Sequence, residues 1–243
     1  MFAIERYNKA QSVEDAVKLL VADPEAKLIA GGTDVLIRLH EGSSDFRSLV
    51  DINGLAVLKE ISEEPDGTVR IGSLATFSEI MDSDVVNKRV PVIAEAAATV
   101  GGPQLRNTAT MGGNICAGVP CADSAGALLV LEADLEIRGI DGKRVVPVMG
   151  FHLGPSRVTL KQGDVLVVFR IRPENYKGFG TAYYKYSMRE AWTLPPSVAQ
   201  PPPVWTATNL TNCGWPSAWP LRRRSAVKPP KKPPRASRFP KKP

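Results

Sequence analysis

Two glycine-rich segments hold the residues of this sequence that could bind an anionic ligand. The first segment reads as a buried strand that turns at two glycines and enters a helix at Thr and Asp, which are preferred capping residues. Glycine lets backbone N–H groups approach a phosphate, and a helix N-terminus favours an anion. Standing alone, such a turn is more often purely structural. The residues are Lys27, Leu28, Ile29, Ala30, Gly31, Gly32, Thr33 and Asp34.

A second turn of similar character lies farther along the chain. Two separate turns of this kind suggest a ligand with a pyrophosphate in its middle, and a dinucleotide meets that requirement. No G-x-G-x-x-G pattern follows the first strand, so a Rossmann site is disfavoured. If a dinucleotide binds to these turns, we therefore expect it to bind in another fold. The residues of the second turn are Ala109, Thr110, Met111, Gly112, Gly113 and Asn114.

The sequence shows no pattern of catalytic or metal-binding side chains. His40 and His152 both lie outside the two turns, and no Ser-His-Asp, metal-ligand or paired-carboxylate pattern is evident. Three cysteines are too few for an ordinary iron–sulfur cluster or a disulfide framework. We therefore expect neither catalytic side chains nor metal ligands in this chain, and we expect Cys116 or Cys121 to be a buried small residue.

The elements that position the turns alternate between helix and strand. Ser12 precedes apolar residues at helical spacing, and Thr76 with Glu79 forms a capping box before another helix. An alanine-rich helix follows Pro91. Strands are predicted at 27–30, 49–52, 69–71, 135–137, 145–146 and 165–171. The order lacks a strict βαβ repeat, so the predicted class is α+β.

Charge and composition divide the chain into a body and a tail. Residues 1–192 carry 21 Lys and Arg against 25 Asp and Glu, whereas residues 193–243 carry ten basic residues, no acidic one and 13 of the 21 prolines. The body is thus a globular sequence and the tail is not. No apolar run is long enough to span a membrane and no signal peptide is evident, so we expect a cytoplasmic protein without a membrane partner.

The two turns together resemble the flavin-binding signatures of the molybdenum hydroxylase flavoproteins. Both motifs, 28–34 and 104–115, occur in the expected order. The likeness continues through 122–124, 164–167 and 184–189, so it covers nearly all of residues 1–192. It is strongest toward the FAD-binding subunits of bacterial xanthine dehydrogenases.

The resemblance implies a PCMH-type FAD-binding domain of two α/β subdomains, 1–55 and 56–176, with FAD wedged between them. Residues 27–34 would wrap the pyrophosphate and 109–114 would form the second wall. Asp123 could instead cap a helix, Leu166 could be ordinary core and Lys185 could be a solvated strand residue. Further positions that match flavin contacts are Val100, Asp123, Val165, Leu166, Tyr184 and Lys185.

The same resemblance implies an electron-transfer role. FAD would take electrons from a 2Fe-2S partner subunit and reduce NAD+, while a molybdenum-cofactor subunit would oxidise the purines hypoxanthine and xanthine. The flavin subunit of an aldehyde, carbon monoxide or aromatic acyl-CoA hydroxylase is an alternative. Binding of nucleic acid through the basic tail belongs to another class; its affinity would be unspecific and salt-sensitive. The body shows no nucleic-acid motif, so we rank nucleic-acid binding below the flavin-binding role.

After Ala191 the sequence departs abruptly from the family pattern. A single-base frameshift would explain the change, because Ala-Trp-Thr read from its third base can encode Met-Asp. On this hypothesis residues 177–192 begin a truncated C-terminal domain, and the Pro-rich basic tail at 193–243 is disordered. The chain would then be a non-productive fragment, unless 1–192 suffice to hold the cofactor.

Overall fold

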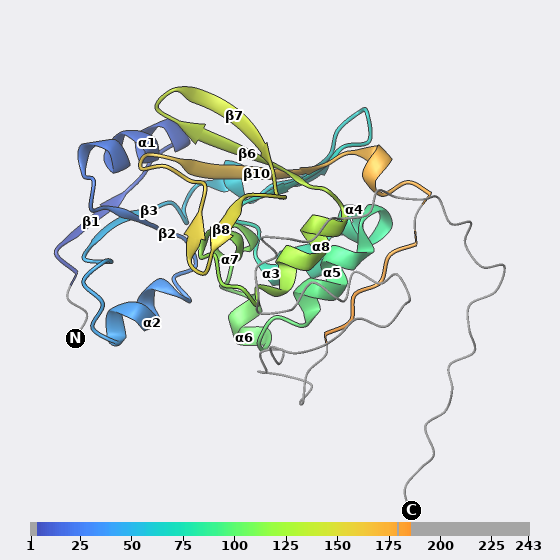
Figure 1. Ribbon diagram of the computed structural model, residues 1–243, viewed down its shortest axis with the longest axis horizontal. Coiled ribbons are helices and arrows are strands. Elements are labelled where there is room, and N and C mark those ends of the chain that lie inside the picture. The colour runs from blue at the N-terminus through green and yellow to red at the C-terminus, as the bar shows by residue number, and fades with distance from the viewer. Residues whose placement is uncertain (1–3, 179, 186–243) are drawn as a thin grey trace, which may run out of the picture.

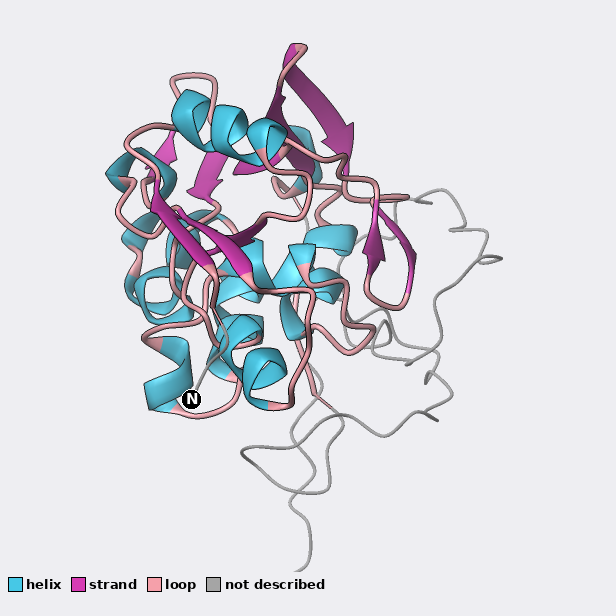
Figure 2. Cartoon of the chain, turned by 90° about the vertical axis from the view of Figure 1, so that its left-hand side faces the viewer, coloured by secondary structure: helices cyan, strands magenta, loops and turns pink. Residues whose placement is uncertain are grey.

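The computed structural model describes residues 4–178 and 180–185. Helices and strands are mixed throughout this part (Figure 2), which confirms the predicted α+β class. The tail predicted to be disordered, 193–243, lies outside the described residues, as do 186–192 of the expected C-terminal domain. No helix in the described part is both long and apolar enough to cross a bilayer.

The N-terminal part is built on a three-stranded parallel sheet. Its strands lie in the order β1 (Arg6–Lys9), β3 (Ser48–Asp51) and β2 (Lys27–Ile29). Helix α1 (Val13–Ala22) connects β1 to β2 (Figure 1), and α2 (Val35–His40) follows the first glycine turn. The parallel order brings the end of β2, and therefore the turn, to one edge of this sheet.

Helix α1 forms as its sequence predicts. The Ser12 side chain accepts a hydrogen bond from the N–H of Asp15, which satisfies one of the free donors at the helix start. The apolar positions of the helix face the sheet and are buried, which removes them from water. These buried residues are Val13, Ala16, Val17 and Leu20.

A larger antiparallel sheet forms the rest of the scaffold. Its strand order is β4 (Ile61–Glu63), β5 (Val69–Gly72), β10 (Val165–Ile171), β6 (Asp134–Gly139) and β7 (Gly142–Pro147). The central strand β10 pairs with both β5 and β6 and has an irregularity between Leu166 and Val168. A separate hairpin, β8 (His152–Gly154) and β9 (Arg157–Val158), lies beside the cavity described below.

Short helices cover one face of the five-stranded sheet (Figure 1). They are α3 (Phe77–Asp82), α4 (Asp84–Arg89), α5 (Pro91–Ala98), α6 (Pro103–Arg106), α7 (Met111–Cys116) and α8 (Asp123–Val130). The predicted capping box of Thr76 and Glu79 starts α3. Two 3-10 turns, Ala56–Leu58 and Pro173–Asn175, complete the elements. The helices and the sheet enclose a continuous apolar core around Phe77, Ile93, Met111 and Phe169.

Candidate functional site

A cavity of about 700 Å³ lies where the two sheets meet. Its walls come from both glycine turns, from the ends of α1 and β2, from β10, and from the loop that leads into β10. The structure therefore brings together side chains that are far apart in the sequence. The sequence-predicted residues that line it are Lys27, Leu28, Ala30, Gly31, Gly32, Thr33, Asp34, Val100, Ala109, Thr110, Gly112, Gly113, Asn114, Asp123, Leu166 and Lys185.

Four predicted contact residues do not line this cavity. Met111 and Val165 are fully buried in the apolar core, and Ile29 is half-buried beside the wall. Tyr184 has 63% of its surface exposed. Alternation along a strand explains the separation of Val165 from Leu166, because neighbouring side chains point to opposite faces.

The first turn touches the second through the backbone of Gly31. A Cβ at Gly31 would lie 1.8 Å from the carbonyl oxygen of Thr108, so no larger residue fits there. Gly32 has a φ of 73°, a left-handed conformation that side chains disfavour. Gly31 is thus required by the packing of the two turns, and Gly32 is required by its backbone conformation.

The backbone N–H groups of the first turn have no acceptor in the described part of the chain. Gly31, Gly32, Thr33 and Asp34 all line the cavity, and none of their N–H groups donates a hydrogen bond to residues 4–178 or 180–185. The turn is held in place instead by its own oxygen atoms. The Gly32 carbonyl accepts from Leu36, and the Asp34 carboxylate pairs with Arg38 at 2.9 Å. These N–H groups can therefore bind an anionic ligand.

The second turn differs from the expectation that it also offers N–H groups to an anion. The N–H of Met111 donates to the Ala75 carbonyl at 3.0 Å, and that of Gly112 donates to the Ser73 carbonyl at 2.8 Å. The N–H of Gly113 donates to the Thr110 hydroxyl at 3.1 Å, which caps α7. The second turn thus forms the wall opposite the first turn, and the N–H groups of Met111 and Gly112 hold it to the segment that follows strand β5.

Ser73 lines the cavity and was not singled out by the sequence. The residue is 3% exposed, and its hydroxyl oxygen has no hydrogen-bond partner among the described residues. A buried hydroxyl without a partner is costly, so it calls for a ligand or water atom. The residue could have been found only from its position after strand β5, next to Gly112.

Asp123 and Lys185 form a buried ion pair in the cavity wall. The Lys185 ammonium lies 2.8 Å from the Asp123 carboxylate, and each side chain is 10% exposed. Burial raises the pKa of Asp123 above its ordinary value, while Lys185 and the Tyr183 hydroxyl act in the opposite direction. Asp123 is the first residue of α8 and makes no capping hydrogen bond, so it does not cap the helix. The Lys185 side chain is largely buried, so it is not a solvated strand residue.

The charged side chains of the cavity leave two lysines unpaired. Asp34 pairs with Arg38, Asp123 with Lys185, and Asp164 with Arg144 outside the cavity. No described carboxylate lies within ion-pair distance of the two remaining cations. These cations are Lys27 and Lys161. The cavity is therefore positively charged on balance, which suits an anionic ligand.

A loop before β10 joins the two sheets at the cavity. The Gln162 amide nitrogen lies 2.8 Å from the Leu20 carbonyl oxygen and 3.2 Å from that of Asp23. It also lies 3.4 Å from the Ala26 carbonyl oxygen, next to Lys27. This loop was missed by the sequence analysis because it contains no motif. It brings Lys161 to the same end of the cavity as Lys27.

The cysteines and histidines of this region show no nucleophilic arrangement. Burial raises the pKa of the Cys116 thiol to about 12, so the thiol stays protonated. His152 Nε2 lies 2.9 Å from the Ile115 carbonyl oxygen, and burial lowers its pKa. Within the described residues, no group of three His, Cys, Asp or Glu side chains could hold a metal ion.

Comparisons with known proteins agree with this architecture. Residues 2–173 match the model of the FAD binding domain in molybdopterin dehydrogenase. A xanthine dehydrogenase FAD-binding subunit of Escherichia coli O157:H7 is 44% identical over 194 residues, which cover 80% of this chain and 66% of that protein. The carbon monoxide dehydrogenase medium chain of Hydrogenophaga pseudoflava is 37% identical over 180 residues, covering 74% and 62%. The chain thus spans slightly less than two thirds of these curated relatives.

Solved structures show the same fold. Carbon monoxide dehydrogenase from Hydrogenophaga pseudoflava aligns with a TM-score of 0.73 at 34% identity, covering 77% of this chain and 65% of that one. Quinoline 2-oxidoreductase from Pseudomonas putida 86 aligns with a TM-score of 0.75 at 26% identity, covering 80% and 67%. With the family match over residues 2–173, this chain belongs to the FAD-binding domains of the molybdopterin dehydrogenases, and FAD is its cofactor.

Proposed function

We propose that this chain is the FAD-binding electron-transfer subunit of a xanthine dehydrogenase-like molybdenum hydroxylase. The observation that carries the proposal is the first glycine turn. Its four free N–H groups line a cavity whose opposite wall is the second turn. A pyrophosphate placed against residues 31–34 would accept hydrogen bonds from these N–H groups, for which the described residues offer no acceptor.

Two further features of the cavity support FAD as its ligand. The unpartnered hydroxyl of Ser73 calls for a polar ligand atom, and the unpaired Lys27 and Lys161 favour a ligand with about two negative charges. A pyrophosphate diester carries that charge. Apolar walls at Leu28, Leu166 and the end of α1 suit the faces of an aromatic ring.

The residues of the chain would bind and orient the cofactor rather than react. When bound, FAD would accept electrons one at a time and pass them on as a hydride. No side chain of the cavity could perform this chemistry. The N–H groups of 31–34 would hold the phosphates, and Asp123 with Lys185 would hold polar groups at another wall. Val100 and Leu166 would exclude water from the cofactor. Four further predicted contacts do not line the cavity, so they would support the lining residues without touching FAD. These residues are Ile29, Met111, Val165 and Tyr184.

Substrate and partners follow from the relatives by analogy. The 44% identity to a xanthine dehydrogenase subunit, against 37% to a carbon monoxide dehydrogenase medium chain, favours purine oxidation over the alternative substrates. On this basis electrons arrive from a 2Fe-2S subunit, a third subunit carries the molybdenum cofactor, and NAD+ is the final acceptor. We place this heterotrimeric enzyme in the cytoplasm.

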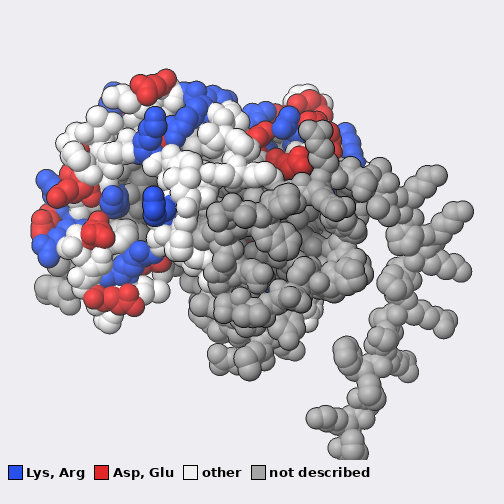
Figure 3. Space-filling model, in the orientation of Figure 1, with Lys and Arg blue, Asp and Glu red and all other residues white. Residues whose placement is uncertain are grey.

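Nucleic-acid binding remains the candidate of another class. It rests on residues 193–243, which lie outside the described part of the chain. On the visible face of the described residues, basic and acidic side chains lie side by side (Figure 3), unlike the basic stripe of a nucleic-acid interface. Binding that disappears when residues 193–243 are deleted, and that falls steeply with salt, would assign it to the tail alone.

The first test is the visible absorption spectrum of the purified chain mixed with FAD and then desalted. Flavin bands should remain with the protein at about one FAD per chain, because the cavity volume and charge suit one dinucleotide. Bands that disappear on desalting would contradict the proposal. Bleaching of the retained bands by anaerobic NADH would support NAD+ as acceptor. Bleaching only by an artificial reductant would leave FAD binding intact and contradict the NAD+ assignment.

A further inference from the structure

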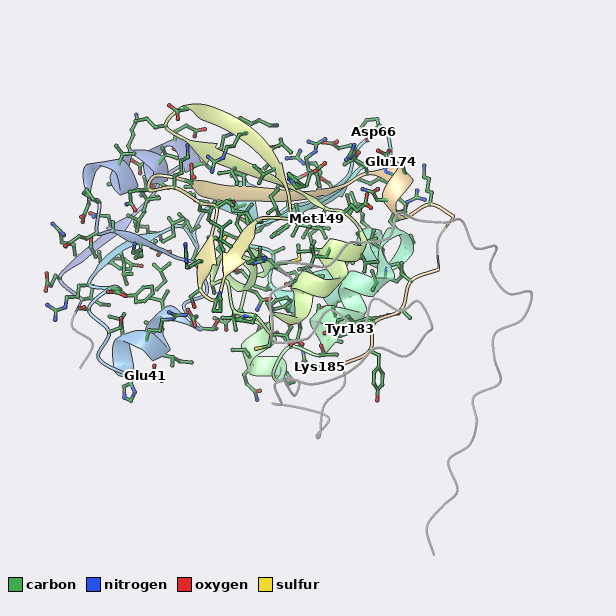
Figure 4. The ribbon with its side chains drawn as sticks, in the orientation of Figure 1. Glu41, Asp66, Met149, Glu174, Tyr183 and Lys185 are labelled. Carbon is green, nitrogen blue, oxygen red and sulfur yellow. The ribbon has the colours of Figure 1, made fainter. Side chains whose placement is uncertain are left out.

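Residues 180–185 form an extended segment that lies along α5 and α8 (Figure 4). The N–H of Tyr183 donates to the Glu95 carboxylate on α5 at 2.6 Å. The Lys185 ammonium donates to the carbonyl oxygen of Thr99, which ends α5, at 3.2 Å. These contacts place Lys185 in the cavity wall. The segment is therefore part of the candidate site rather than a passive continuation of the chain.

Tyr183 and Lys185 bind opposite oxygens of the same carboxylate. The Tyr183 hydroxyl donates to Asp123 Oδ1 at 3.2 Å, and Lys185 Nζ donates to Asp123 Oδ2 at 2.8 Å. A carboxylate oxygen can accept two hydrogen bonds and an ammonium can donate three. Each Asp123 oxygen thus keeps one acceptor position, and Lys185 keeps one N–H, after its bonds to Asp123 and Thr99 are counted within the described residues.

These remaining positions match the hydroxyl groups of a sugar or sugar alcohol, which both donate and accept. FAD contains such hydroxyls in its ribityl chain and in its ribose. A match of this kind requires the carboxylate plane to be fixed, because rotation would turn the acceptor positions away from the cavity. Lys185 alone fixes one oxygen, and the Tyr183 hydroxyl fixes the other.

We propose that Tyr183 is a positioning residue for the cofactor: its hydroxyl fixes the Asp123 carboxylate so that Asp123 and Lys185 bind a hydroxyl group of FAD. This proposal rests on the proposed function, because it assumes that FAD occupies the cavity. Tyr183 belongs to neither glycine turn and would be a further residue on which FAD binding depends. Tyr183 itself is absent from the cavity wall and acts through Asp123.

The direct test is the affinity of Tyr183→Phe for FAD, measured by fluorescence titration. The substitution keeps the ring and removes one hydrogen bond to a charged group, so the affinity should fall about ten-fold. Tyr176→Phe is the matched control. Its hydroxyl donates to the Gly67 carbonyl at 2.6 Å in a buried position away from the cavity, so its loss should lower stability without changing FAD affinity.

A pH profile separates positioning from a purely structural role. Protonation of Asp123 breaks its pair with Lys185, so FAD affinity should fall as the pH drops through the pKa of Asp123. The Tyr183 hydrogen bond lowers that pKa, hence Tyr183→Phe should move the fall to higher pH. Tyr176→Phe should leave the profile in place. The ionisable groups around Asp123 are Lys185, Tyr183, Glu95 on α5, Cys116 on α7 and Cys121.

A double-mutant cycle then tests whether Tyr183 acts through Asp123. In an Asp123→Ala background, which has no acceptor for the Tyr183 hydroxyl, Tyr183→Phe should change FAD affinity by less than about two-fold. A ten-fold loss in both backgrounds would overturn the proposal, as would an unchanged affinity and pH profile in the single variant. A wild-type chain that fails to retain FAD would overturn the proposed function as well. Wild-type binding with an unaffected Tyr183→Phe variant would remove this inference alone.

Discussion

The two glycine-rich turns of the cavity are alike in sequence and differ in what their backbone N–H groups bind. In the first turn, residues 31–34 leave these groups without an acceptor in the described chain. In the second turn, the N–H groups of Met111, Gly112 and Gly113 are all bound within the protein. The first turn is therefore suited to bind the ligand, and the second turn is suited to build its wall.

The difference shows that a glycine motif can have two physical purposes. In the first turn, Gly31 allows the backbone to approach Thr108 and leaves the neighbouring N–H groups free. In the second, Gly112 allows close packing on Ser73, because a Cβ there would lie 2.5 Å from the Ser73 carbonyl oxygen. Substitutions in the two turns should accordingly affect ligand affinity and stability differently.

The largest effect is expected for Gly31→Ala. The added Cβ would collide with the rigid Thr108 backbone, so the free energy of unfolding should fall by about 3 kcal/mol and FAD retention should be lost. Urea denaturation and the visible spectrum measure the two effects. Gly154→Ala is the control, because nothing lies within 4 Å of its added Cβ. Wild-type behaviour of Gly31→Ala would contradict the packing of the turns.

A smaller effect, confined to binding, is expected for Thr33→Ala. Thr33 lines the cavity and its side chain has no hydrogen-bond partner in the described residues, so its removal should not change the stability of the FAD-free chain. A lost hydrogen bond to phosphate would weaken FAD binding by about 1.5 kcal/mol. Titration with FAD, beside urea denaturation without it, checks both statements. A stability loss equal to the affinity loss would show that Thr33 is structural.

The opposite result is expected for Thr110→Ala in the second turn. Its hydroxyl caps α7 by accepting from Gly113, and loss of such a cap costs about 1 kcal/mol of stability. FAD affinity, measured where the chain is still folded, should stay close to that of the wild type. If FAD affinity fell without any change in stability, the contrast between the turns would be wrong.

The smallest effect concerns pH and His152, which supports the second turn through the Ile115 carbonyl. Burial lowers the pKa of His152 below its ordinary 6.5. A base with a lowered folded pKa contributes stability above its unfolded pKa and loses it as the pH falls through the folded value. The wild type should therefore lose more stability between neutral pH and pH values below 6.5 than His152→Gln does. Parallel urea curves would contradict this.

Local signals in the sequence predicted much of the fold. The Ser12 cap, the capping box of Thr76 and Glu79, and the apolar strand 165–171 all depend on neighbouring residues and are confirmed. Strand β1 was missed because all four of its residues are exposed and show no alternation. The division into subdomains at residues 55 and 56 stays a prediction, although the two sheets lie on either side of it.

The site was only partly predictable because its chemistry depends on distant partners. Family resemblance located most of the lining residues, but it could not show that the N–H groups of the second turn are bound by Ser73 and Ala75. Likewise the unpartnered Ser73 hydroxyl, the Gln162 bridge and the Tyr183 bond to Asp123 arise only when separate elements meet. No local pattern marks such residues.

The central claim is that the first turn binds a pyrophosphate, and a comparison of FAD with riboflavin tests it most directly. Both ligands contain the isoalloxazine ring and the ribityl chain, but only FAD has phosphates for residues 31–34 and the two unpaired lysines. Titration of the chain followed by flavin fluorescence should give at least about hundred-fold tighter binding of FAD, since two charge-assisted hydrogen bonds contribute about 3 kcal/mol. Equal affinity for riboflavin and FAD would contradict the account.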